Sequence, residues 1–434
     1  MTQYCHTTPA ADTLVAWLVD ARARTIALVG DLTDEQLIGP RLATVNPLQW
    51  EIGHVAWFQE KWMLRRDGSA SVRGDADSLY DSTAIPHDVR WDLLLPSRAD
   101  TLAYMQRVQD RVLERIHHGQ DESDAYFVQL AIFHEDMHAE AFAITRQTLS
   151  YPAPRTTGGH DVSRSLLAVS RPERSFSDDA RIPGGTYLLG ANQKQGFVFD
   201  NEKWVHPVEI APYAISRAPV TQAGFAAFVD TGGYQQQELW SPEGWTWLSK
   251  ARAEHPIYWR RMSEGWQRRA FDRWIPLELN WPMMHVNWYE ADAWCRWAGR
   301  RLPTEAEWEL AAASMEKLCY PWGDEFPDAK HANLNAQHLE CVDITAYPAG
   351  DSPFGCRQMI GNVWEWTADS FRPYPGFVAD PYKEYSEPWF GDHYVLRGGS
   401  WATPGRLLRN TWRNFYKPHR ADMWAGFRTC ALEV

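Results

Sequence analysis

The residues with the clearest chemistry are two histidines in the segment F-H-E-D-M-H-A-E at 133–140. His134 and His138 are four residues apart in a segment with a helical pattern. Positions i and i+4 of a helix share a face, with Cβ atoms roughly 5–6 Å apart, so two imidazoles can hold one metal ion. His54, in a second segment with helical pattern at 50–60, is a candidate third ligand. If these helices pack together, three nitrogens converge and leave coordination positions open, as a catalytic metal requires.

Ligand type alone leaves the metal undecided, because three imidazoles suit iron, zinc or copper. Glu140 lies two residues beyond His138, about 200° around the helix, and is expected outside the ligand set. His117 and His118 end another expected helix, where a solvated cation is favourable. His87, in a long loop, has no assigned role.

Helical segments must position these residues. The N-terminal part of the chain has four of them, at 11–31, 47–65, 97–117 and 122–149. The first and third carry apolar stripes at helical spacing, and the set predicts a four-helix bundle. The connection from 67 to 95 is long, which predicts a crossover between helices, and loops of this length are often functional.

The character of the sequence changes after residue 150. Turn-forming residues predict a linker at 156–175 between a bundle domain at 1–155 and a second domain at 176–434. Short strand-like runs, many glycines and prolines, and clustered tryptophans predict that this second domain is irregular α+β. Its clearest elements are a strand, a turn and a second strand at 182–190, and helices at 287–298 and 304–313, the last with a capping box from Thr304 and Glu307.

Composition excludes several classes of protein. A chain of 434 residues is too long for one ordinary core and predicts two domains. The net charge of −13 argues against nucleic-acid binding, which calls for a basic surface. The start of the chain lacks the pattern of a signal peptide, and no apolar run is long enough to span a membrane. We therefore expect a cytoplasmic protein.

Cysteines and aromatic residues carry weaker signals. Six cysteines are scattered without a C-x-x-C pair, so we expect reduced thiols and no cysteine-based zinc site. The 24 tryptophans are unusual. We expect most of them to fill cores, although aromatic rings also line pockets for quaternary ammonium groups.

Two sets of residues resemble known families. The bundle with its three histidines and Glu140 resembles the DinB-like metal-binding bundle. The second domain resembles the formylglycine-generating-enzyme domain, a variant of the C-type-lectin fold. Its matching motifs include I-P-G-G-T-Y (182–187), H-V-N-W-Y-E-A (285–291), R-L-P-T-E-A-E-W-E (301–309), G-N-V-W-E-W-T (361–367), L-R-G-G-S-W (396–401) and A-G-F-R (425–428).

Both domains in one chain resemble the ergothioneine sulfoxide synthases and their relatives, the selenoneine synthases. The resemblance implies a mononuclear non-haem enzyme that holds Fe(II) on His54, His134 and His138. Such enzymes use O2 to join a sulfur or selenium donor to C2 of the imidazole of hercynine, which is trimethylhistidine. It also implies an active site between the domains, with aromatic rings against the trimethylammonium group. A zinc-dependent transferase or hydrolase and a non-enzymatic binding protein remain alternatives.

The stretch N-F-Y-K-P-H-R at 414–420 bears on the donor. Asn414 and Arg420 match donor-binding positions of the synthases that use γ-glutamylcysteine. Phe415 and Tyr416 replace the Trp-Asp of those enzymes, which removes an acidic partner for the donor's ammonium group. An aromatic pair better suits cysteine or a sugar-borne donor. With the likeness of the 80–91 loop and the F-H-E-D-M-H segment to the selenoneine branch, this favours a selenosugar; cysteine or another thiol is the alternative.

Four further positions follow from the resemblance. Tyr382 and Tyr385 match a Y-x-x-Y pair in which a tyrosine donates a proton or hydrogen, although aromatic packing would also explain them. Met137 stands where related enzymes have a glutamine, and it cannot donate a hydrogen bond to the substrate imidazole. Arg90 is a candidate for a substrate carboxylate or else forms a surface ion pair. The absence of a cysteine after L-R-G-G-S-W argues against copper-dependent formylglycine formation.

Overall fold

The computed structural model describes residues 8–118, 122–155, 176 and 178–433. The chain forms two compact units, one from Thr7 to Gly159 and the other containing the rest of the chain. Their division falls inside the segment 156–175, predicted as a linker, which lies outside the described residues.

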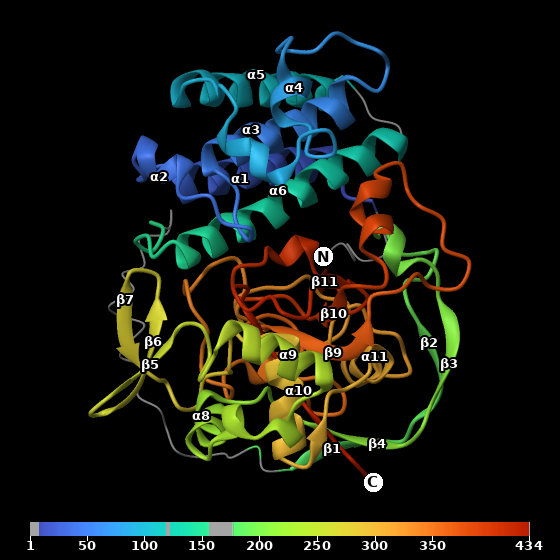
Figure 1. Cartoon of the computed structure of the whole chain (residues 1–434). Helices are drawn as coiled ribbons and strands as arrows, with labels where there is room; N and C mark the ends of the chain where they lie inside the picture. The colour runs from blue at the N-terminus through green and yellow to red at the C-terminus, as the bar shows by residue number, and fades with distance from the viewer. Residues whose placement is uncertain (1–7, 119–121, 156–175, 177, 434) are drawn as a thin grey trace. The chain divides into compact units, whose positions relative to one another are not determined.

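Four long helices form the N-terminal unit, as the periodicity predicts (Figure 1). They are α1 (Ala11–Val29), α3 (Leu48–Gln59), α5 (Arg98–His117) and α6 (Glu122–Thr148). Helix α1 packs on α6, and α3 packs on both α5 and α6. Every residue of α3 is buried, so this helix lies at the centre of the unit. It continues into a π-helical turn, η1 (Glu60–Leu64).

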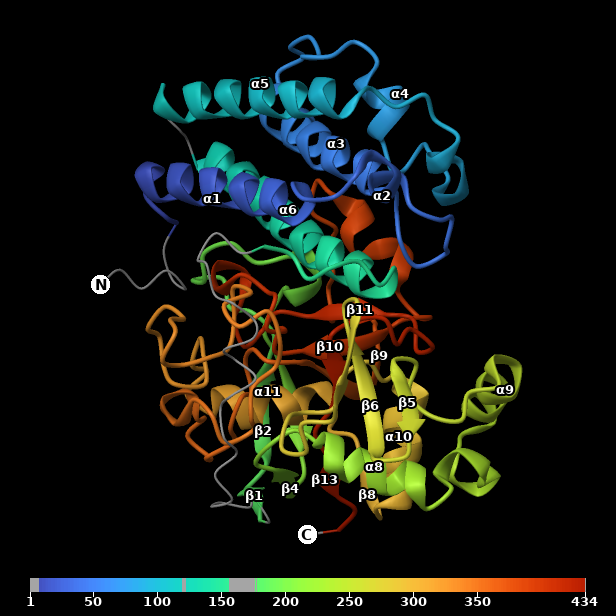
Figure 2. The same cartoon turned by 90° about the vertical axis from the view of Figure 1, so that its left-hand side faces the viewer.

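The long connections of the bundle contain short helices that the sequence did not reveal. A short helix, α2 (Asp34–Ile38), precedes α3. The 67–95 connection, expected to be loop, contains α4 (Ala76–Tyr80) and the 3₁₀ segment η2 (His87–Trp91). Helix α4 packs against α3 (Figure 2). Helices of five residues are too short to show a 3.6-residue period, which explains why the pattern missed them.

A buried ion pair joins three helices of the bundle beside the histidine segment. Arg22 of α1 donates from Nε to Glu135 of α6 over 2.8 Å, and from Nη2 to the Gln59 side chain of α3 over 2.8 Å. Arg22 and Glu135 are both buried. A buried ion pair of this kind is weak evidence for stability. A shift of one helix along another would, however, break its contacts. The ion pair therefore fixes the register of α3 against α6.

The C-terminal unit is a mixed α+β domain, and its described residues form four small sheets. Two four-stranded sheets have the orders β1-β4-β13-β8 and β11-β10-β9-β12. Of the two smaller sheets, one pairs β2 with β3 and the other has the order β5-β6-β7. The strands are β1 (Asp179–Ile182), β2 (Gly185–Leu189), β3 (His206–Ile210), β4 (Tyr213–Ser216), β5 (Trp259–Met262), β6 (Gly265–Ala270), β7 (Arg273–Pro276), β8 (Arg300–Arg301), β9 (Trp364–Ser370), β10 (Tyr394–Arg397), β11 (Asn414–Tyr416), β12 (Ala425–Gly426) and β13 (Cys430–Ala431).

In the described part of this unit, four α-helices accompany the sheets, namely α8 (Gln222–Asp230), α9 (Pro242–Ala251), α10 (Trp288–Trp297) and α11 (Glu305–Ala313). Helices α10 and α11 confirm the two helices predicted for this domain. The predicted strand, turn and strand at 182–190 is confirmed in part: β2 lies within it, but β1 ends at its first residue, and the two strands pair with β3 and β4 instead of with each other. The capping box of α11 is present as predicted, because Thr304 accepts from the Glu307 backbone and the Glu307 side chain accepts in return. Side chains such as Trp308, Trp364 and Trp366 are fully buried in the core.

Two further expectations concern the whole chain. Within the described residues, no helix is long and apolar enough to cross a membrane. Cys319 is disulfide-bonded, so the expectation of reduced thiols is wrong at that position. Four other cysteines, Cys295, Cys341, Cys356 and Cys430, are free and buried. Cys5 lies outside the described residues.

Glu290, which caps α10, is expected to make the stability of the C-terminal unit depend on pH. Its carboxyl is buried and accepts from the Tyr234 hydroxyl over 2.6 Å and from the Asn287 backbone over 2.8 Å. Burial raises the pKa of Glu290 from 4.5 to about 7. Because the folded pKa lies above the unfolded one, its stabilising contribution is complete below pH 4.5 and is lost as the pH rises through about 7.

The substitution Glu290→Gln keeps a neutral capping group and removes this titration. We expect the variant to exceed the wild type in free energy of unfolding at pH 8 by up to about 3 kcal/mol, with little difference at pH 5. Urea unfolding at both pH values measures this. A difference between the two proteins that does not change with pH would contradict the assignment.

Candidate metal centre

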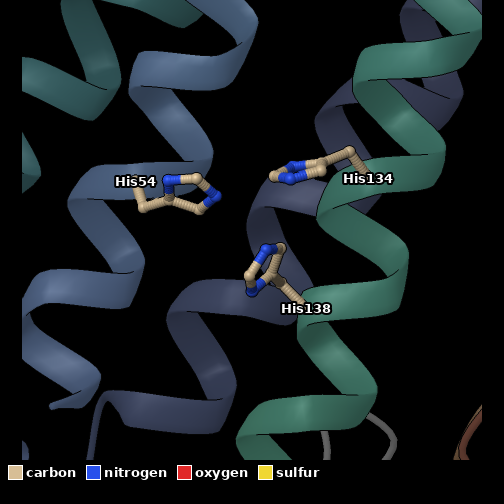
Figure 3. Close-up of side chains that lie close together, drawn as sticks. All are labelled: His54, His134 and His138. Carbon is tan, nitrogen blue, oxygen red and sulfur yellow. The ribbon is translucent and has the colours of Figure 1, made fainter. Parts of the chain in front are cut away.

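The three predicted histidines meet inside the N-terminal unit. His54 comes from α3, and His134 and His138 come from successive turns of α6; their rings face one another (Figure 3). The possible ligand atoms all lie within 4.8 Å of one another. Ring centroids are 5.1 Å apart for His54 and His134 and 4.5 Å apart for His134 and His138. The arrangement brings together the i, i+4 pair and a residue eighty positions earlier in the chain.

Two of the three rings have a hydrogen-bond acceptor behind them. His54 donates from Nδ1 to the Tyr80 carbonyl oxygen over 2.8 Å. His138 donates from Nδ1 to Oε1 of Glu51 over 2.6 Å. Because a carbonyl and a carboxylate can only accept, each holds the ring proton on Nδ1 and leaves the Nε2 lone pair for a metal.

Burial keeps the site in the form that binds metal. His54 and His134 are 3% and 4% exposed. Burial, with a smaller contribution from neighbouring His138, holds the pKa of both imidazoles well below the usual 6.5. The rings are therefore neutral at physiological pH. Three imidazoles in a mostly buried cluster fit a divalent transition metal such as Fe(II).

Aromatic rings surround the histidines. Phe58 stacks on His134 at 3.6 Å between centroids. Trp50 and Trp57 flank His54, at 4.9 and 5.6 Å. These rings restrict the movement of the ligands and exclude water from the sides of the cluster.

Glu51, which accepts from His138 of the cluster, was not predicted from the sequence. It is 1% exposed, and its second oxygen, Oε2, is buried with no hydrogen-bond partner in the described part of the chain. A signal was present, because Glu51 precedes His54 by three residues and shares its helix face. Glu140, in contrast, is outside the group of possible ligands, as expected.

The two predicted substrate residues of this unit lie near the cluster. Arg90 of η2 places its guanidinium carbon 4.1 Å from the centre of the Trp50 ring, the same ring that stacks on His54. It donates to Oδ1 of Asn46 over 2.7 Å, and its Nε is buried without a partner among the described residues. Met137 is half-buried beside His138 on α6.

The predicted catalytic tyrosines lie in the C-terminal unit, at the short 3₁₀ segment η7 (Lys383–Tyr385). The centroids of Tyr382 and Tyr385 are 6.3 Å apart. Tyr385 stacks on Phe199 at 4.3 Å and accepts from Nε1 of Trp412 over 3.2 Å. Burial raises the pKa of Tyr385, so this phenol keeps its proton.

The predicted donor-binding residues are on and after β11. Phe415 stacks on Phe371 at 4.1 Å. Oδ1 of Asn414 accepts from the Phe415 backbone over 2.8 Å. Arg420 donates to Asp422 through two hydrogen bonds of 2.6 Å, and its guanidinium carbon is 5.4 Å from the centre of the Tyr416 ring.

Known proteins resemble both units. Residues 18–142 match the DinB superfamily, and residues 166–432 match the family described as the sulfatase-modifying factor enzyme 1-like domain. The hercynine oxygenase of Mycobacterium tuberculosis is 36% identical over 424 residues, covering 96% of this chain and 97% of that protein. That of Mycolicibacterium smegmatis is 35% identical, covering 96% and 98%. The formylglycine-generating enzyme of Streptomyces coelicolor is 34% identical over 57% of this chain and 84% of its own.

Proposed function

The chain belongs to the hercynine oxygenase family, and from this premise we propose that it joins a selenium or sulfur donor to imidazole C2 of hercynine with O2 as oxidant. The observation that carries the proposal is the cluster of His54, His134 and His138 in a chain that aligns with hercynine oxygenases over nearly its whole length. In the reaction, the C2–H and Se–H or S–H bonds break and a C2–Se or C2–S bond forms. One oxygen atom leaves as water, and the other is added to selenium or sulfur.

The three histidines are proposed to hold Fe(II). When bound, Fe(II) supplies electrons one at a time, which O2 needs in order to react with closed-shell substrates. The residues of the chain have separate roles. Glu51 and the Tyr80 carbonyl hold protons on Nδ1 of His138 and His54, and the rings of Trp50 and Phe58 keep water from the sides of the site.

A selenosugar is the proposed donor, which makes the chain a selenoneine synthase; a synthase of the ergothioneine type that uses cysteine or another thiol is the alternative. The support is the absence of an acidic residue at Phe415 and Tyr416. The pairing of Arg420 with Asp422 adds to it, because that arginine already has a carboxylate partner.

Other residues have proposed roles in the same reaction. Tyr385, or else Tyr382, donates a proton or hydrogen, and the protonated, buried phenol of Tyr385 suits this role. Arg90 is proposed to bind a substrate carboxylate through its unpartnered Nε. Asn414 is proposed to contact the donor, and half-buried Met137 to face the substrate imidazole.

A competition assay tests the function and the donor together. Iron-loaded protein receives hercynine, O2 and an equimolar mixture of a selenosugar, a thiosugar, cysteine and γ-glutamylcysteine. Oxygen uptake and mass spectrometry of the products are followed, and the assay is repeated with Tyr385→Phe and Tyr382→Phe. We expect a selenosugar adduct as the main product. A cysteine adduct would establish the alternative donor, and no iron binding or no hercynine-dependent oxygen uptake would overturn the oxygenase assignment.

A further inference from the structure

Helix α4 contacts one stripe of α3 at three successive points. Nε1 of Trp50 donates to the Leu79 carbonyl over 2.6 Å, and Nδ1 of His54 donates to the Tyr80 carbonyl over 2.8 Å. Nε1 of Trp57 donates to the Asp77 carboxylate over 2.7 Å. These donors occupy positions i, i+4 and i+7 of α3, which lie on one helix face. The middle donor is the histidine of the metal cluster, and the outer two are the tryptophans that flank it.

The close approach of α4 depends on Gly53. A Cβ atom at this position would lie 2.3 Å from Cε1 and Cζ of the Tyr80 ring. Tyr80 is 1% exposed, so its ring has little room to move away. Any larger side chain at position 53 would therefore push Tyr80 outward, together with the carbonyl that accepts from His54.

Asp77 fixes the other end of α4. Besides accepting from Trp57, its carboxylate accepts from Arg65 through two hydrogen bonds of 2.7 Å. Hydrogen bonding to Arg65 lowers the pKa of Asp77 to about 2, so the group is ionised at any physiological pH. Arg65 follows η1 directly, so Asp77 joins the crossover connection to both α3 and η1.

We propose that α4 is a positioning clamp for His54, and that Gly53 and Asp77 are the two residues that set it. Gly53 allows the Tyr80 carbonyl to reach His54, and Asp77 holds α4 in register along α3. The inference rests on the proposed metal centre but not on the identity of the substrates. The clamp gives the 67–95 connection a role in the site, because its Tyr80 carbonyl accepts from Nδ1 of His54 and so orients that ring.

Affinity for Co(II), followed by its visible ligand-field absorption and by competition with a chelator, tests the clamp. For Gly53→Ala we expect about tenfold weaker binding or more, and an altered Co(II) spectrum, because partners behind metal-binding histidines contribute about 10–100-fold in affinity. The double variant Gly53→Ala/Tyr80→Leu removes the clashing ring atoms and keeps the backbone carbonyl. It is expected to recover part of the lost affinity.

Asp77→Ala, compared with Asp75→Ala, provides an independent test. Asp75 is a neighbouring carboxylate that pairs with Arg73 in the same connection. We expect Asp77→Ala to weaken Co(II) binding about tenfold and Asp75→Ala to leave it unchanged. If Gly53→Ala does not fold, the comparison of Asp77→Ala with Asp75→Ala alone tests the clamp. Thermal midpoints are recorded as well, because a purely structural role would lower them without changing the affinity or the spectrum.

Outcomes separate the clamp from the proposed function. If the wild type binds Co(II) and Asp77→Ala binds it equally well with the same spectrum, the clamp is wrong and the metal centre stands. If the wild type binds neither Co(II) nor Fe(II), the metal centre is wrong, and so are the proposed function and the clamp.

Discussion

Replacing His134 with alanine is expected to abolish stable metal binding and to lower turnover by at least about 1,000-fold, since a catalytic metal supplies several kcal/mol of transition-state stabilisation. His134 is buried, with Phe58 stacked on its face at 3.6 Å. Two remaining imidazoles would hold a metal weakly. With alanine at position 134, the space left by the imidazole would be lined by the Phe58 ring and would offer no replacement ligand.

Metal content after anaerobic iron loading and oxygen uptake with hercynine and donor measure this effect. His117→Ala is the matched control, because His117 is exposed at the end of α5 and outside the cluster. We expect this control to behave as the wild type. Retention of iron and turnover by His134→Ala would show that the cluster is not the metal centre.

Replacing Glu51 with alanine is expected to weaken metal binding by up to about 100-fold while leaving all three histidines in place. The carboxylate accepts the Nδ1 proton of His138 over 2.6 Å and thereby fixes the ring and its tautomer. Without it, the ring is free to turn, and Nε2 no longer points toward the other two rings in every molecule.

Glu51→Gln separates the charge of this residue from its shape. A buried carboxylate with one unpartnered oxygen is costly to desolvate. We therefore expect metal-free Glu51→Gln to be at least as stable as the wild type in urea, yet to bind Fe(II) or Co(II) more weakly. Equal metal affinity in Glu51→Ala and the wild type would rule out the orienting role.

The histidine cluster could be predicted from the sequence because its signal is local. His134 and His138 show their spacing within one helix, and the four helices show their period over long segments. The hydrogen-bond partners of the histidines cannot be predicted from the sequence in the same way. The partner of His54 is a backbone carbonyl, which has no sequence signature, and it is carried by α4, a helix of five residues.

The C-terminal unit shows the same contrast. The starts of helices α10 and α11 are visible in the sequence, because each has a capping box, which is a short pattern of side chains. The sheets are not, because strands such as β8, β12 and β13 have two residues each and cannot display an alternating pattern. Their pairing joins Cys430 to both Ile215 and Arg301, and such long-range register is fixed by packing alone.

Because the three histidines lie on two different helices, metal binding is also expected to raise the free energy of unfolding of the N-terminal unit. A metal held by His54 and the two histidines of α6 links segments eighty residues apart, and the unfolded chain offers no such site. By mass action, free metal at 100 times its dissociation constant would add about 2.7 kcal/mol to the free energy of unfolding of this unit. Under the proposed function, metal supply is therefore expected to affect the resistance of the bundle to proteolysis as well as the activity of the protein.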